Sequence, residues 1–80
     1  MAEKRLAVVT GAARGIGRAI SFELLRQGRI VAGLDIKEDQ LKELAQAARD
    51  AGFDIVTRCV DITQSDRLTE VLESLASEFG

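Results

Sequence analysis

Three short apolar runs divide the chain, and a stretch with helical periodicity follows each of them. The runs at residues 6–9 and 30–34 predict β-strands that are buried on both faces, and the run at 55–60 predicts a third strand. In the stretches that follow, apolar side chains recur every three or four residues, as on one face of an amphipathic helix. These positions are Ile16, Ala19, Ile20 and Leu24 in the first stretch, Leu41, Leu44, Ala45 and Ala48 in the second, and Leu68, Val71, Leu72, Leu75, Ala76 and Phe79 in the third. The pattern therefore predicts strands and helices in alternation.

This alternation also predicts the topology. The connections are too short for antiparallel detours, which favours parallel strands joined by right-handed crossovers. We expect an α/β fold with a Rossmann-like parallel sheet, the β-α-β-α-β-α portion of a doubly wound fold. Gly28 and Gly52 should end the first two helices, and Thr63 with Asp66 has the pattern of a capping box for the third. The first two helices should cover one face of the sheet and the third helix the other, which leaves part of the strands uncovered.

Composition limits the class of protein. The 80 residues carry a net charge of -2, with 46% hydrophobic and 30% charged residues, which is typical of at most one soluble domain. No stretch approaches the roughly 18 uninterrupted apolar residues of a membrane span. The charged N-terminus lacks the pattern of a signal peptide, so a cytoplasmic location without membrane attachment is expected. Cys59 is the only cysteine and histidine is absent, so we expect neither an internal disulfide nor a Cys/His metal site.

The charge pattern argues against nucleic acid as a partner. Eleven basic residues are scattered among thirteen acidic ones, so no basic patch is evident. The aromatic residues are three Phe, which offer few platforms for base stacking. A small-molecule ligand is therefore the better expectation.

A glycine-rich segment lies between the first predicted strand and the first helix. Gly11, Gly15 and Gly17 give the backbone freedom for a tight turn and, because they lack Cβ atoms, let a ligand approach the main chain. The free N–H groups and the dipole of the following helix favour an anion such as a pyrophosphate. The spacing G-x-x-x-G-x-G is neither the common G-x-G-x-x-G fingerprint nor a Walker loop. The alternative interpretation is a tight turn that binds nothing.

A carboxylate follows the second predicted strand. Asp35 comes eighteen residues after Gly17, near the spacing at which an acidic residue accepts hydrogen bonds from the ribose of an adenosine. The alternative is a helix N-cap, which Glu38, three residues later, supports. We favour the ribose interpretation because the glycine-rich segment precedes this strand.

Three motifs together resemble the short-chain dehydrogenase/reductase family over the whole chain. The family carries T-G-x-x-x-G-x-G after its first strand, here starting at Thr10, and D-x-T after its third strand, here starting at Asp61. Many of its NAD-preferring members have an acidic residue where this chain has Asp35. The resemblance implies an oxidoreductase (EC 1.1.1.-) that transfers hydride between a nicotinamide cofactor and an alcohol or carbonyl carbon. It also implies a homo-oligomer, usually a tetramer, for the full-length protein.

The resemblance assigns roles to residues of this chain. The segment that would line the path of the pyrophosphate and the nicotinamide-proximal part of the cofactor consists of Gly11, Gly15, Ile16 and Gly17. Asp61 and the backbone of Ile62 would hold the adenine. The alternative for Asp61 is an aspartate that only stabilises a turn or caps a helix.

Arg14 bears on the choice between NAD and NADP. In NADP-preferring relatives a basic residue at this loop position can meet the 2′-phosphate, and Arg suits bidentate phosphate binding. A 2′-phosphate would also approach Asp35, and two like unit charges 4 Å apart repel by about 4 kcal/mol at an effective dielectric of 20. Arg14 is compatible with NAD whether it pairs with Asp35 or lies in solvent. The sequence therefore predicts NAD, with NADP the less favoured cofactor.

The groups that would perform the chemistry are not found in these residues. The family's general acid/base is a Tyr, assisted by a Lys and a Ser, and this chain contains no Tyr. We therefore assign no catalytic residue and interpret residues 1–80 as the N-terminal part of a single NAD(P)-binding Rossmann domain, inactive alone. Its substrate would be a small alcohol or carbonyl compound, such as a 3-oxoacyl thioester or a secondary alcohol. The alternatives are a stand-alone, non-catalytic nucleotide-binding module and a portion of an NADP-dependent carbonyl reductase.

Overall fold

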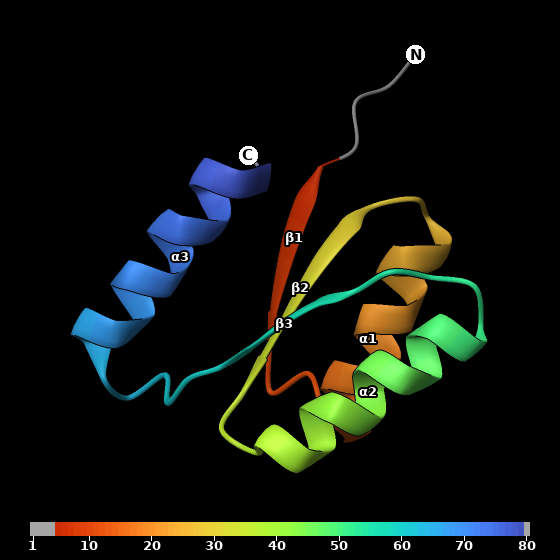
Figure 1. The fold of residues 1–80 in the computed structure, drawn as a ribbon, viewed down its shortest axis with the longest axis horizontal. Coiled ribbons are helices and arrows are strands. Elements are labelled where there is room, and N and C mark those ends of the chain that lie inside the picture. Colours follow the sequence, from red (N-terminus) through yellow and green to blue (C-terminus); the bar gives the residue numbers. More distant parts are fainter. Residues whose placement is uncertain (1–4, 80) are drawn as a thin grey trace.

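Strands and helices alternate along the chain in the computed structural model, which describes residues 5–79 (Figure 1). The elements are β1 (Leu6–Thr10), α1 (Gly15–Arg26), β2 (Ile30–Asp35), α2 (Glu38–Asp50), β3 (Val56–Cys59) and α3 (Ser65–Phe79). The predicted order of elements is confirmed. No helix within the described residues is both long enough and apolar enough to cross a membrane.

The three strands form one parallel sheet with β2 in the middle. Leu6 is opposite Ile30 in the pair β1 and β2, and Asp35 is opposite Cys59 in the pair β2 and β3. Parallel strands end at the same edge of a sheet, so the loops that follow β1, β2 and β3 all leave from its carboxyl edge. This edge is where the predicted site residues are expected to meet.

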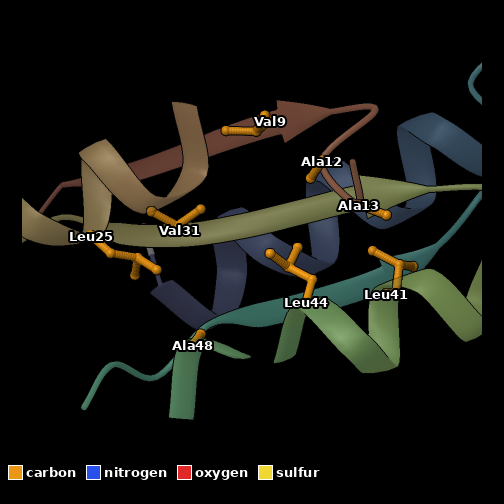
Figure 2. Close-up of a cluster of buried hydrophobic side chains, with 8 residues drawn as sticks. All are labelled: Val9, Ala12, Ala13, Leu25, Val31, Leu41, Leu44 and Ala48. Carbon is orange, nitrogen blue, oxygen red and sulfur yellow. The ribbon is translucent and has the colours of Figure 1, made fainter. Parts of the chain in front are cut away.

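The helices cover both faces of the sheet, as predicted. α1 and α2 lie on one face, where Val31 of β2 and Leu44 of α2 are fully buried, and Figure 2 shows Leu41 and Leu44 directed from α2 toward the strands. On the other face, Leu75 of α3 packs with Leu34 of β2. Figure 1 shows α3 on the opposite side of the strands from α1 and α2. The α/β prediction, a Rossmann-like portion of a doubly wound fold, is confirmed.

The prediction of the apolar face of α1 is wrong at its first turns. Ile16 is 80% exposed and Ile20 is 46% exposed, whereas Ser21 and Leu25 are buried. Gly17, Ser21 and Leu25 are spaced four residues apart and so form the stripe that faces the rest of the fold. This stripe begins with small residues because the start of α1 lies directly against the preceding loop, and hydrophobicity alone does not reveal such a contact.

Two finer predictions, about the start of α3 and the length of β3, also need correction. Thr63 does not cap α3 through a box with Asp66, because its hydroxyl donates to Oδ1 of Asp61 at 2.6 Å. The backbone N–H of Leu68 donates to the carbonyl of Gln64, so the helix begins at Ser65 with Gln64 before it. β3 is also shorter than the apolar run at 55–60, since its paired residues are Val56–Cys59.

The sheet is only partly covered on the side of α3. Val8 lies two residues from Leu6 on the same face of β1, and it is 39% exposed. Leu72 of α3 is 40% exposed. Apolar side chains of this size therefore remain in contact with solvent in residues 5–79.

Candidate functional site

The loops at the carboxyl edge of the sheet surround a pocket of about 190 Å³. Its lining residues come from the ends of all three strands and are Gly11, Leu34, Asp35, Ile36, Val60, Asp61 and Ile62. Four of the predicted cofactor-binding residues are thus brought together around one space, although Asp61 is 50 residues from Gly11 in the sequence. The other four, Arg14, Gly15, Ile16 and Gly17, lie at the start of α1.

The glycines of the first loop have steric reasons to be glycines. Gly11 and Gly15 have φ angles of 63° and 62°, in the left-handed region that other L-residues rarely adopt. A Cβ atom on Gly17 would overlap the carbonyl oxygen of Gly11 and lie 2.7 Å from its carbonyl carbon. The loop is therefore folded tightly back against the first turn of α1.

Backbone hydrogen bonds divide the amides of this loop into two groups. The N–H of Ala12 donates to the carbonyl of Leu34 at 3.1 Å, and the N–H of Ala13 donates to Oδ2 of Asp35 at 3.1 Å. The helical ladder starts only when the N–H of Arg18 donates to the carbonyl of Arg14. The three amides before it, at Gly15, Ile16 and Gly17, belong to the first turn, where a helix has no acceptors of its own. They form a group of donors at the positive end of the α1 dipole, which favours an anionic ligand.

Asp35 contacts two segments besides its own strand. Its Oδ2 accepts from the N–H of Ala13, and its Oδ1 accepts from the N–H of Lys37 at 3.2 Å. The N-cap position of α2 is Lys37, and no side chain within residues 5–79 caps it, so the alternative that Asp35 is the N-cap is wrong. Partial burial raises the pKa of Asp35. The amide hydrogen bonds, first that of Ala13, and the charge of Arg14 lower it by more than burial raises it, so the pKa lies below its ordinary value of 3.8. The side chain is therefore a carboxylate at neutral pH.

Asp61 is held in a tight turn. Its Oδ1 accepts from the N–H of Thr63 at 2.9 Å and from the hydroxyl of Thr63 at 2.6 Å. Both hydrogen bonds lower the pKa of Asp61 below its ordinary value, and the bond from the hydroxyl contributes more than the bond from the amide. Asp61 thus has the turn-stabilising role considered for it, and it also lines the pocket.

Arg14 and Ile16 extend into solvent at the start of α1. Arg14 occupies the N-cap position with extended backbone angles, and its side chain is exposed. Within residues 5–79 it makes no ion pair with Asp35, although its charge helps to lower the pKa of that carboxyl. Of the two arrangements considered for Arg14, the structure shows the solvated one.

Three lining residues of the pocket were not among the predicted site residues: Leu34, Ile36 and Val60. Ile36 and Ile62 are 56% and 49% exposed, so each offers an apolar side chain at the rim. An Ile directly after the acidic end of a strand, as in Asp35-Ile36 and Asp61-Ile62, is the sequence signal that would have indicated Ile36. The donor at Ala13 is a backbone N–H, and no side-chain pattern marks it.

A larger hollow of about 370 Å³ lies at the opposite edge of the sheet. It is lined by Ile30 and Val56, which begin β2 and β3, and by Phe53 and Phe79. Ligands of open α/β sheets bind outside the carboxyl ends of the strands. The smaller pocket, which adjoins the glycine-rich loop and two carboxylates, is therefore the better candidate site.

The chain matches the model of the short chain dehydrogenase family over residues 5–80. It is 39% identical over 77 residues to cis-4-hydroxycyclohexanecarboxylate dehydrogenase of Sinomonas cyclohexanicum, an alignment that covers 96% of this chain and 30% of that relative. Carveol dehydrogenase from Mycobacterium avium, solved in complex with NAD, aligns with a TM-score of 0.84 and 27% identity over 95% of this chain and 32% of that one.

A metagenomic short-chain oxidoreductase solved in complex with NADP aligns with a TM-score of 0.88 and 29% identity, over 95% of this chain and 34% of that one. The chain thus spans about a third of the length of these relatives. Its family match and its fold agree, and the chain belongs to the short-chain dehydrogenase family.

Proposed function

We propose that residues 1–80 are the NAD-binding N-terminal part of a longer oxidoreductase, which transfers hydride between a nicotinamide cofactor and an alcohol or carbonyl carbon. The observation that supports this most strongly is the pocket at the carboxyl edge, where Asp35 and Asp61 lie beside the glycine-rich loop. Carboxylates suit ribose and adenine donors, and the first-turn amides of α1 suit a pyrophosphate. The residues present therefore fit a dinucleotide.

Each group of residues would contact a different part of the cofactor. The amides at Gly15, Ile16 and Gly17 would donate to the pyrophosphate, with Gly11 leaving room for it. Asp35 would accept from the hydroxyls of the adenosine ribose. The adenine would lie between the exposed side chains of Ile36 and Ile62, with Asp61 and the backbone of Ile62 beside its edge.

We propose NAD as the preferred cofactor because Asp35 is ionised at neutral pH. A 2′-phosphate next to this carboxylate would bring like charges together, at a cost of about 4 kcal/mol for a 4 Å separation at an effective dielectric of 20. Arg14 is solvated and lies at the loop, so it remains the residue that favours NADP. Relatives with NAD and with NADP are both known among the solved structures, so the charge balance at Asp35 is the basis of the proposal.

In the reaction, the nicotinamide supplies or accepts the hydride when the cofactor is bound. The residues of this chain bind and orient the adenosine half and stabilise the charge of the pyrophosphate through backbone hydrogen-bond donors. A Tyr as general acid/base, with its Lys and Ser, would come from outside residues 1–80, since this chain has no Tyr. The proposal includes a small alcohol or carbonyl substrate of 3-oxoacyl or secondary-alcohol type, a tetramer and a cytoplasmic location.

Titration of the full-length protein with NADH, followed by nicotinamide fluorescence, tests the proposed pocket. Ile62→Asp places a charge at its apolar rim and should weaken NADH binding by tenfold or more, on the order of the 1.5 to 3 kcal/mol that burial of an Ile side chain contributes. Gln64→Asp is the matched control, because it adds the same charge to the same loop at an exposed residue outside the pocket. Equal effects of the two substitutions, or no binding of NADH or NADPH to the unchanged protein, would refute the proposal.

A further inference from the structure

We propose that Asp35 positions the glycine-rich loop for pyrophosphate binding, in addition to accepting hydrogen bonds from the ribose. This inference rests on the proposed function and adds a second role for one side chain. It starts from the contact that joins the end of β2 to the loop, the hydrogen bond from the N–H of Ala13 to Oδ2 of Asp35.

Two consecutive amides attach the loop to β2. Ala12 donates to the backbone carbonyl of Leu34, a bond that any residue at position 34 would accept. Ala13 donates to a side chain, so this second bond depends on the identity of residue 35. Both alanines are almost fully buried, at 0% and 3% exposure, which leaves water little access to replace a lost partner. Removing the carboxylate would therefore leave the N–H of Ala13 unpaired in a buried position.

Ala12 and Ala13, whose amides hydrogen-bond to β2, lie directly before the donors that would hold a pyrophosphate. Ala13 precedes Arg14, the N-cap of α1, and the first-turn amides of Gly15, Ile16 and Gly17 follow directly. Ala12 also lies against β2, because a Cβ atom on Gly33 would be 3.0 Å from the Cβ of Ala12. A shift of Ala13 would thus displace the start of α1, and with it the direction of the donor group.

The geometry allows both roles at the same time. Each carboxylate oxygen can accept two hydrogen bonds, and the backbone amides of Ala13 and Lys37 occupy one position on each oxygen. The backbone amide of Ile36 also interacts with this carboxylate, which leaves at least one of the four accepting positions for a ribose hydroxyl. Asparagine at position 35 would keep one oxygen for the N–H of Ala13 but would lose the charge, whereas leucine would lose the acceptor and the charge together.

The test uses a probe that has the pyrophosphate but no ribose hydroxyls: 2′,3′-dideoxyadenosine 5′-diphosphate, titrated as a competitor of NADH into the full-length protein. If Asp35 acts on the ribose alone, Asp35→Leu should bind this probe as tightly as the unchanged protein, or more tightly because a negative charge is gone. If Asp35 also positions the loop, Asp35→Leu should bind the probe about tenfold more weakly, as expected for losing a hydrogen bond to a charged group. Asp35→Asn should recover most of this loss. Asp54→Asn, at an exposed residue that lines no part of the proposed site, is the control for the loss of charge.

A second measurement applies to the unchanged protein and does not depend on the folding of a variant. In amide hydrogen exchange, the N–H of Ala13 should exchange slowly and that of Gly15 quickly, because within residues 5–79 only the first has an intramolecular acceptor. Undiminished probe binding by Asp35→Leu, or an Ala13 amide that exchanges as fast as that of Gly15, would overturn the positioning role. Either result leaves the proposed function intact if NADH still binds. Failure of the unchanged protein to bind NADH and the probe would instead reject the proposed function, and this inference with it.

Discussion

Replacing Gly17 with alanine adds one methyl group where α1 meets the preceding loop. In most helices this substitution stabilises the protein, by up to about 1 kcal/mol, because alanine has the higher helix propensity. Here the new Cβ would overlap the carbonyl oxygen of Gly11 and lie 2.7 Å from its carbonyl carbon and 3.2 Å from Cα of Ala12. All three atoms belong to the backbone, so no side-chain rotation relieves the contact.

The loop or the helix must therefore move. Overpacking of this kind typically costs about 1 to 3 kcal/mol, which exceeds the gain in propensity. We expect Gly17→Ala to lower the free energy of unfolding of the full-length protein by up to about 2 kcal/mol, the difference between these two contributions. NADH should also bind at least tenfold more weakly, because the displaced residues carry the proposed pyrophosphate donors.

Urea denaturation and NADH titration measure the two effects. Ala19→Gly is the matched control: Ala19 is exposed two residues along the same helix, so this substitution should reduce stability through propensity alone and leave NADH affinity unchanged. A Gly17→Ala protein that is as stable as the unchanged one and binds NADH equally well would refute the steric reasoning.

Three further predictions concern stability. The pKa of Asp35 in the folded protein lies below its ordinary value of 3.8, so the stability that its carboxylate provides is present above pH 3.8 and is lost as the pH falls through the folded-state pKa. The difference in unfolding free energy between the unchanged protein and Asp35→Asn should therefore be constant from pH 7 to pH 5 and shrink below pH 3.8. Leu44→Ala should cost about 2 to 5 kcal/mol in urea denaturation, because Leu44 is fully buried, and Leu72→Ala, at a residue 40% exposed, should cost markedly less. Residues 1–80 expressed alone should bind a hydrophobic dye and melt without a sharp transition, because Val8 and Leu72 lack cover in this part of the fold; a cooperative melt would contradict this.

The elements of the fold were predictable because each has a strong local signal. Continuous apolar runs such as 30–34 mark strands that are covered on both faces, and their alternation with helical stretches leaves few topologies. The predicted ends of α1 and α2 also agree with the structure, since Gly28 and Gly52 follow these helices closely. These features depend on residues near one another in the sequence.

The errors arose where contacts between distant parts decide the outcome. Ile16 and Ile20 have the spacing of a buried face, yet the contact of Gly17 with the loop turns a different side of α1 inward. Thr63 has the pattern of a capping residue, but the carboxylate of Asp61 is the partner of its hydroxyl. Hydrophobic periodicity contains no information about either contact.

The candidate site also has a part that was predictable from the sequence and a part that was not. Gly11, Asp35 and Asp61 stand out because their residue types and spacing match a known arrangement, and the structure brings all three to one pocket. The hydrogen bond from Ala13 to Asp35 was not predictable, because every residue has a backbone N–H and only the folded loop shows where this one points.

The ratio of the dissociation constants of NADPH and NADH, measured on the full-length protein at neutral pH, tests the central claim most directly. The ionised Asp35 at the end of β2 predicts that NADH binds at least tenfold more tightly than NADPH, well within the roughly 4 kcal/mol of repulsion expected from a 2′-phosphate at 4 Å. Asp35→Asn should narrow the ratio, because it removes this charge. Equal or tighter binding of NADPH by the unchanged protein would contradict the account.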